Sequence, residues 1–136
     1  MAASRVSRFW TNQSPKVRSL LRIASAFTFM LAGSSKLFAF PVGMPNGMKL
    51  VPFSEVWFAG VLEVFGGGLL VLGLCTRPVA FVLSGEMAVA YFQAHFPHSP
   101  WPTVNGGVPA FLYCFLWLYF SSAGAGPLSI DALRGK

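Results

Sequence analysis

The sequence predicts an all-α fold, a bundle of four antiparallel transmembrane helices with both termini in the cytoplasm. Hydrophobic residues make up 54% of the 136 residues and charged residues only 10%, which is too apolar for an ordinary soluble domain of this size. Four apolar stretches alternate with segments rich in proline and glycine. One of these stretches, Trp57–Pro78, contains an apolar run of about 18 residues, enough to cross a bilayer as a helix. We expect one integral membrane domain, residues 1–136.

The first half of the chain predicts a basic tail and two helices. Residues 1–16 are polar and basic, and we expect this tail to lie against anionic lipid on the cytoplasmic side. A first apolar helix follows over about residues 17–40. The proline-rich segment 41–53 ends that helix and forms a loop on the far side, where it can fold back as a lid. Ser54 is a plausible N-cap for a second helix over about residues 55–74.

The second half predicts two more helices joined by a longer loop. Pro78 suits the first position of a third helix, which we expect over about residues 78–94. A loop dense in proline and aromatic residues leads to a fourth helix over about residues 108–122. Ser129 is a candidate cap for a short helical turn in the polar tail.

Lysine and arginine near the helix ends predict the orientation, because positive residues resist transfer to the outside. Most of them fall on the side of the two termini, and only two fall on the other side. The first group contains Arg5, Arg8, Lys16, Arg18, Arg22, Arg77, Arg134 and Lys136, and the second contains Lys36 and Lys49. Both termini are therefore expected in the cytoplasm.

Glu63 is the ionisable residue around which the second helix is arranged. Gly60, Gly66 and Gly67 lie three or four residues away along the helix, so the carboxylate shares a face with glycines. Such a face allows a second helix to approach closely. Lys36 lies in the outer part of the first helix, at a depth from which it can pair with Glu63. Two interpretations stay open: a pair that only joins two helices, or a polar site that binds a ligand.

Glu86 is expected deeper, near the middle of the third helix, with no basic residue at its depth. A carboxyl group in such surroundings favours its neutral form, and it serves either as a structural hydrogen-bonding group or as a proton relay. The polar groups that could face it are Tyr113, Trp117, Ser25 and Thr28.

Arg22 and Arg77 are expected near the cytoplasmic boundary, where each would contact lipid headgroups or another anion. His95 and His98 are separated by Pro97 and have only Glu55 as a further ligand, so we expect no metal site. The net charge of +6 does not indicate nucleic-acid binding, because the basic residues form no stripe interleaved with exposed aromatics. Cys75 and Cys114 form no CxxC pair, and we expect both to be reduced and packed.

The order of these features resembles the DoxX family of small four-helix membrane proteins. The resemblance covers nearly the whole chain, from Leu20 to Leu133. It is carried by Arg22, Leu31-Ala32-Gly33 and Lys36, the Gly60-x-x-Glu63-x-x-Gly66-Gly67 helix, Leu72-Gly73, Thr76-Arg77, the alanine-rich third helix and the closing Gly126-Pro127-Leu128-Ser129-Ile130-Asp131.

The resemblance implies a multi-pass protein of the bacterial inner membrane with a redox-associated role. Some family members resemble subunits of thiosulfate:quinone oxidoreductase, others are linked to quinone or catechol stress and to complexes that handle thiol oxidation, and related proteins assist membrane-protein assembly. The chain shows no cofactor motif and lacks paired cysteines for thiol exchange of its own. A quinone near Lys36 and Glu63 needs no cysteine, and Trp57, Tyr91 and Trp101 could stack on it.

Three alternative functions are therefore expected. The first is binding of a quinone or a similar lipophilic molecule beside Lys36 and Glu63. The second is an accessory or assembly role in a larger respiratory or photosynthetic membrane complex, with the bilayer and other membrane subunits or further copies of the chain as partners. The third is transport of a small molecule or of protons through Glu86. Whether the protein is an enzyme stays open.

Overall fold

The computed structural model of the protein describes residues 4–135, and the prediction of an all-α fold is confirmed. No strand occurs within this range. The α-helices are α1 (Arg5–Phe38), α2 (Glu55–Leu72), α3 (Thr76–Ala90), α4 (Pro102–Asn105), α5 (Val108–Ala123) and α6 (Ile130–Leu133), with a 3-10 turn η1 (Pro45–Gly47) and a π-helical segment η2 (Tyr91–His95) that continues α3.

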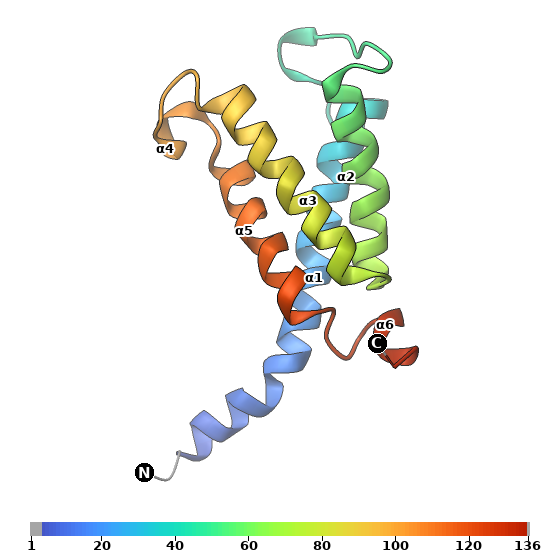
Figure 1. Ribbon diagram of the computed structural model, residues 1–136, viewed down its shortest axis with the longest axis vertical. Coiled ribbons are helices and arrows are strands. Elements are labelled where there is room, and N and C mark those ends of the chain that lie inside the picture. The colour runs from blue at the N-terminus through green and yellow to red at the C-terminus, as the bar shows by residue number, and fades with distance from the viewer. Residues whose placement is uncertain (1–3, 136) are drawn as a thin grey trace.

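The four long helices run alternately up and down, as Figure 1 shows. α1 packs mainly along α2, α3 packs mainly along α5, and the contact of α2 with α3 joins the two pairs. The apolar centre includes Phe29, Leu70, Leu83, Trp117 and Phe120. The segment around η1 and α4 lie at one end of the molecule, and α6 lies near the other end, beside the turn from α2 to α3.

Local capping explains where several helices begin and end. The Ser54 hydroxyl accepts a hydrogen bond from the backbone N–H of Trp57 at 3.2 Å, so the predicted N-cap of the second helix is confirmed. That helix ends at Gly73, which adopts the left-handed conformation with φ of +67°. Ser129 caps α6 by accepting from the N–H of Ala132 at 3.1 Å.

The first and third helices begin earlier than predicted. α1 starts at Arg5, with Ser4 as its cap, and Pro15 lies inside it, so most of the expected basic tail is helical. Its first part extends beyond the ends of the other helices (Figure 1). Proline removes one backbone hydrogen bond, but here it does not end the helix. α3 starts at Thr76, so Pro78 occupies its third position instead of the first.

The molecule places polar groups inside and large apolar side chains outside. α2 is the described helix that is long and apolar enough to cross a membrane, and only 22% of its residues are buried within the chain. α5 is a shorter apolar helix. The buried polar or charged residues are Ser19, Arg22, Glu63, Thr76, Ser84 and Asp131, whereas Phe27, Phe58, Phe65, Phe81, Leu112 and Phe115 are exposed. An apolar exterior of this kind needs a covering of lipid or protein.

Candidate functional site

An ion pair between α1 and α2 lies at the centre of the candidate site. Lys36 Nζ lies 2.5 Å from Glu63 Oε1. The Glu63 side chain is only 2% exposed, whereas that of Lys36 is 31% exposed. The second carboxylate oxygen, Oε2, is buried and has no hydrogen-bond partner among the described residues. Glu63 therefore keeps a free acceptor beside a cation that is reachable from outside.

Close packing of α1 against α2 brings the pair together. A Cβ atom added at Gly33 would lie 2.7 Å from Glu63 Cβ and 2.8 Å from the Gly60 carbonyl oxygen. A Cβ atom at Gly60 would lie 3.0 Å from Leu37, and one at Gly67 would lie 3.2 Å from the Ala26 carbonyl oxygen. The predicted glycine face therefore lies largely against α1.

Gly66 belongs to a second contact of the same helix. A Cβ atom at Gly66 would lie 2.9 Å from the Leu83 side chain of α3. The glycines of α2 thus allow close contact with two neighbouring helices, α1 and α3, because successive positions along a helix point in different directions.

A cavity of about 260 Å³ opens beside the ion pair. Its walls come from α1, α2, α3, η2 and the start of α5. This volume lies slightly below the roughly 300–1,000 Å³ of typical ligand pockets, so it suits a single ring rather than a whole long-chain molecule. The lining side chains that can interact with such a ring are Lys36, Glu63, Phe29, Tyr113 and His95.

Glu86 forms no hydrogen bond with the described part of the chain. Both oxygens of its carboxyl group are buried, and none of the residues 4–135 forms a hydrogen bond with them. Glu63 differs from Glu86 in this respect, because its Oε1 accepts a hydrogen bond from Lys36.

The polar residues expected to face Glu86 bond elsewhere. The Tyr113 hydroxyl lies 2.5 Å from Thr28 Oγ1 and 3.4 Å from the Ser25 carbonyl oxygen. The Trp117 ring packs against Phe29 and Tyr113, and its buried indole N–H has no partner among the described residues. These contacts join α5 to α1, and none of them reaches Glu86.

The three aromatic residues expected to stack on a ligand do not line the cavity. Trp57 packs on Phe53, with ring centroids 5.0 Å apart. Trp101 is 68% exposed in the loop before α4. Tyr91 is buried, and its hydroxyl donates to the Pro100 carbonyl at 3.0 Å. Their places at the cavity are taken by Phe29 and Tyr113, which are in ring contact at 5.0 Å.

Arg22 lies in the interior and not at a lipid headgroup. Its side chain is completely buried, and Nε donates to the Leu70 carbonyl at 2.7 Å. The guanidinium also donates to the carbonyls of Leu128, at 2.6 Å, and of Ala125. It joins the C-terminal end of α2 to the segment after α5. A buried cation at this place is stabilised by backbone carbonyls.

Arg77 of α3 is exposed, and its guanidinium group lies at the C-terminal end of α5. Its guanidinium donates to the carbonyl of Ser122 and, at 3.4 Å, to that of Ser121. These are carbonyls of the last turn of the helix, which have no partner within it. The remaining N–H groups of Arg77 are available to other acceptors.

Asp131 is a structural residue that the sequence interpretation missed. Its two oxygens accept hydrogen bonds at 2.9 Å from the N–H groups of Cys75 and Thr76, which begin α3. Burial alone would raise the pKa of Asp131, but these hydrogen bonds and the nearby charge of Arg134 hold the pKa below its ordinary value. Only four residues of this basic chain are acidic, and this scarcity is the feature of the sequence that could have indicated a structural role for Asp131.

Comparison with known proteins identifies the family. The family model described as DoxX matches residues 17–96, more than half of the chain. The chain belongs to the DoxX family. An uncharacterized protein of Haemophilus influenzae is 43% identical to it over 120 residues, which cover 86% of this chain and 90% of the relative. No solved structure matches the chain.

The DoxX match spans the region that holds the candidate site. Lys36, Glu63, Glu86, Arg22 and Arg77 all lie within residues 17–96, whereas Asp131 lies beyond them. The family is membrane-associated, in agreement with the apolar, exposed surface of α2. The resemblance noted from the sequence is therefore confirmed at the level of the family.

The histidine and cysteine side chains of this DoxX protein, within residues 4–135, do not gather into a metal or disulfide site. Within residues 4–135 no group of three or more histidine, cysteine or acidic residues could hold a metal ion. Cys75 and Cys114 are both free thiols. Cys75 is exposed at the start of α3 and not packed as expected, because its left-handed conformation belongs to a tight turn. His95 lines the cavity, and its Nδ1 lies 3.1 Å from the Asn105 carbonyl oxygen.

Proposed function

We propose that this DoxX protein crosses the bacterial inner membrane four times and binds the head group of a quinone, or of a similar lipophilic molecule, beside Lys36 and Glu63 in a redox-associated role. The observation that carries the proposal is the unpartnered Glu63 Oε2 next to the Lys36 ammonium at a small cavity. Buried polar atoms without partners are rare in proteins. A donor on a ligand, such as a hydroxyl group of the reduced quinol form, would satisfy this carboxylate oxygen.

The chemistry of the Lys36–Glu63 pair suits an oxygen-substituted ring. The Lys36 ammonium can donate to a ring carbonyl, and Glu63 Oε2 can accept from a ring hydroxyl. Phe29 and Tyr113 supply aromatic surface on the cavity wall. Since the cavity has only about 260 Å³, an isoprenoid tail would extend into lipid between the helices.

Four membrane spans are supported by the lengths of the helices and by their surfaces. α3 with its π-helical continuation covers residues 76–95, which at about 1.5 Å per residue gives roughly 30 Å, the thickness of the hydrocarbon core. α2 has a similar length, and α5 is somewhat shorter. The exposed side chains of all three are mainly apolar.

Direct binding measurements test the proposal. The full chain would be purified in mild detergent and titrated with a short-chain ubiquinol, the reduced form that carries ring hydroxyls, while the fluorescence of its tryptophans is followed. We expect saturable quenching that is weakened at least tenfold by Glu63→Gln and by Lys36→Met. Lys49→Met removes an exposed lysine from the loop at the same end and serves as the matched control. Equal binding by all four proteins would refute the proposal.

A second candidate function, an accessory subunit of a larger membrane complex, is favoured by the loop between α1 and α2. Phe40, Val51 and Phe53 are each exposed there by more than 60%, and the loop does not cover the cavity as a lid. Exposed apolar residues outside the helices suit contact with another protein. Extraction from native membranes in mild detergent, followed by native mass spectrometry, should then show larger subunits bound. A chain that runs alone, with no co-purifying protein, would exclude this role.

A further inference from the structure

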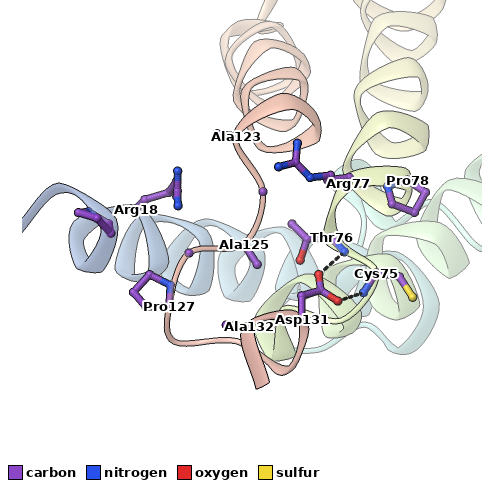
Figure 2. Close-up of a pocket in the computed structure, with 13 residues that line it drawn as sticks. Arg18, Cys75, Thr76, Arg77, Pro78, Ala123, Ala125, Pro127, Asp131 and Ala132 are labelled. Carbon is purple, nitrogen blue, oxygen red and sulfur yellow. Dashed lines mark hydrogen bonds between the residues drawn. The ribbon is translucent and has the colours of Figure 1, made fainter. Parts of the chain in front are cut away.

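A second and larger cavity lies at the opposite end of the bundle from the ion pair. It has a volume of about 590 Å³ and is bordered by α1, the start of α3 and the segment between α5 and α6. Figure 2 shows Arg18 on one side of the segment Ala123–Ala125 and Arg77 on the other, together with Thr76 and Asp131. The candidate quinone site uses none of these residues.

The charged groups of this cavity favour an anion. Two guanidinium groups, of Arg18 and Arg77, line it, and Asp131 is the acidic residue in its wall. Both oxygens of Asp131 already accept hydrogen bonds from the N–H groups of Cys75 and Thr76. The first N–H groups of α3 are therefore occupied, and an added anion would have to be held by side chains.

Hydrogen-bond donors without partners point into the same region. The buried Nε of Arg18 has no hydrogen-bond partner among the described residues, and no hydrogen bond joins Arg18 to any of them. The Thr76 side chain is 1% exposed and lies beside the Asp131 carboxylate (Figure 2), so its hydroxyl is directed to that acceptor and not to the cavity. Arg77 uses only Nη1, for the carbonyls at the end of α5. An acceptor-rich group in the cavity would satisfy both arginines.

The shape of the wall leaves room for a group larger than a single ion. Gly124 and Gly126 border the cavity with φ of +80° and +83°, a conformation that side-chain-bearing residues rarely adopt. A Cβ atom at Gly124 would lie 3.2 Å from Arg77 Nη2. The volume falls within the range of about 300–1,000 Å³ that is typical of ligand pockets.

We propose that this cavity binds a phosphate group through Arg18 and Arg77. Guanidinium groups match the spacing of phosphate oxygens, and charge-assisted hydrogen bonds to them are strong. The phosphate can belong to the headgroup of an anionic phospholipid or be free in solution. The proposal is independent of quinone binding at the other end of the molecule.

Titration of the delipidated full chain in nonionic detergent tests this proposal. The probes are short-chain phosphatidylglycerol, the matching diacylglycerol without phosphate, and inorganic phosphate. We expect phosphatidylglycerol to bind and Arg18→Gln to weaken that binding by roughly tenfold or more, as the loss of a charge-assisted hydrogen bond predicts. Arg18→Gln breaks no hydrogen bond to a described residue, so the fold should persist, as far-ultraviolet circular dichroism would show.

One control variant and a second cavity variant make the outcome decisive. Arg8→Gln removes the same charge from an exposed position of α1 outside the cavity and should leave the affinity unchanged. Arg77→Gln removes the second guanidinium group of the cavity and should weaken binding, as Arg18→Gln does. If inorganic phosphate displaces the lipid at similar concentrations, the natural ligand is free phosphate; if it does not, the ligand is a lipid headgroup. Equal affinity for diacylglycerol, or equal losses in Arg18→Gln and Arg8→Gln, would overturn the proposal.

Discussion

At the scale of single residues, the pair of Lys36 and Glu63 could be foreseen because the position of a residue along a helix gives its expected depth in the membrane. Two opposite charges at similar depths on consecutive helices have little choice of partner in an apolar chain. The aromatic wall of the cavity could not be foreseen in the same way. Phe29 and Tyr113 face it because of how α1 and α5 are rotated, and that rotation is set by packing over the whole bundle.

Removing one member of the pair should cost far more than removing both. We expect Lys36→Met to lower the free energy of unfolding by about 3 kcal/mol, because the buried Glu63 carboxylate loses its cation. Lys36→Met combined with Glu63→Met should return to within about 1 kcal/mol of the parent. Thermal unfolding in detergent, followed by circular dichroism, measures both. Equal losses in the single and double variants would show that the charges do not interact.

The depressed pKa of Asp131 makes stability depend on pH in a definite window. The folded state binds the proton of Asp131 more weakly than the unfolded chain does, so the stabilisation is complete above the ordinary aspartate pKa of about 3.9. It is lost as the pH falls through the lower pKa of the folded state. Asp131→Asn should therefore be less stable than the parent at neutral pH, and the difference should shrink below about pH 4. Unfolding temperatures measured between pH 3 and 7 test this, and a constant difference would contradict it.

At the scale of helices, sequence reasoning succeeded where a local cap sets a boundary. Ser54 and Ser129 start their helices through hydrogen bonds within three residues. It failed for α3, because the cap of that helix is Asp131, more than fifty residues away in the chain. It also failed for α1, since the expected start followed the change from polar to apolar residues near residue 17, whereas the helix continues through the polar, basic segment from Arg5.

Glycines with and without close neighbours should respond oppositely to the same substitution. Gly33→Ala places a Cβ atom 2.7 Å from Glu63 Cβ, so α1 and α2 must separate, and we expect a loss of about 1–3 kcal/mol. Gly85→Ala meets nothing within 4 Å and should stabilise α3 by up to about 1 kcal/mol through its higher helix propensity. The two unfolding temperatures, measured in one detergent, give the answer. A similar change in both variants would mean that the close approach at Gly33 has no energetic weight.

At the scale of the whole molecule, composition predicts the class of the fold, and the buried polar groups explain why the chain can adopt it. Exposed phenylalanines cover the helices, while Arg22, Glu63 and Asp131 are enclosed. The apolar exterior could be read from the sequence. The hydrogen bonds that join the segment after α5 to α1, to the end of α2 and to the start of α3 could not, because they join residues far apart in the chain.

The orientation of the chain in the membrane can be tested with its own cysteine. Cys75 is exposed at the end of the bundle where α6 lies, which we expect to face the cytoplasm. In a Cys114→Ala variant, a membrane-impermeant maleimide should label Cys75 in inside-out vesicles and not in intact spheroplasts. His98→Cys in a background without the native cysteines, at an exposed position of the opposite loop, should show the reverse. Labelling of both positions from one side would refute the four-span arrangement.

The bonding of Arg22 has a consequence for biosynthesis. Two of its carbonyl acceptors, those of Ala125 and Leu128, follow it by 103 and 106 residues. A growing chain emerges from the ribosome N-terminus first, so the guanidinium reaches the membrane long before these acceptors have been synthesised. Until then it must stay at the lipid phosphates or with another temporary partner. Residues translated more than a hundred positions after Arg22 thus complete the interior of the protein, and a ribosome that stops before them leaves a chain with an unsatisfied cation that proteases can recognise.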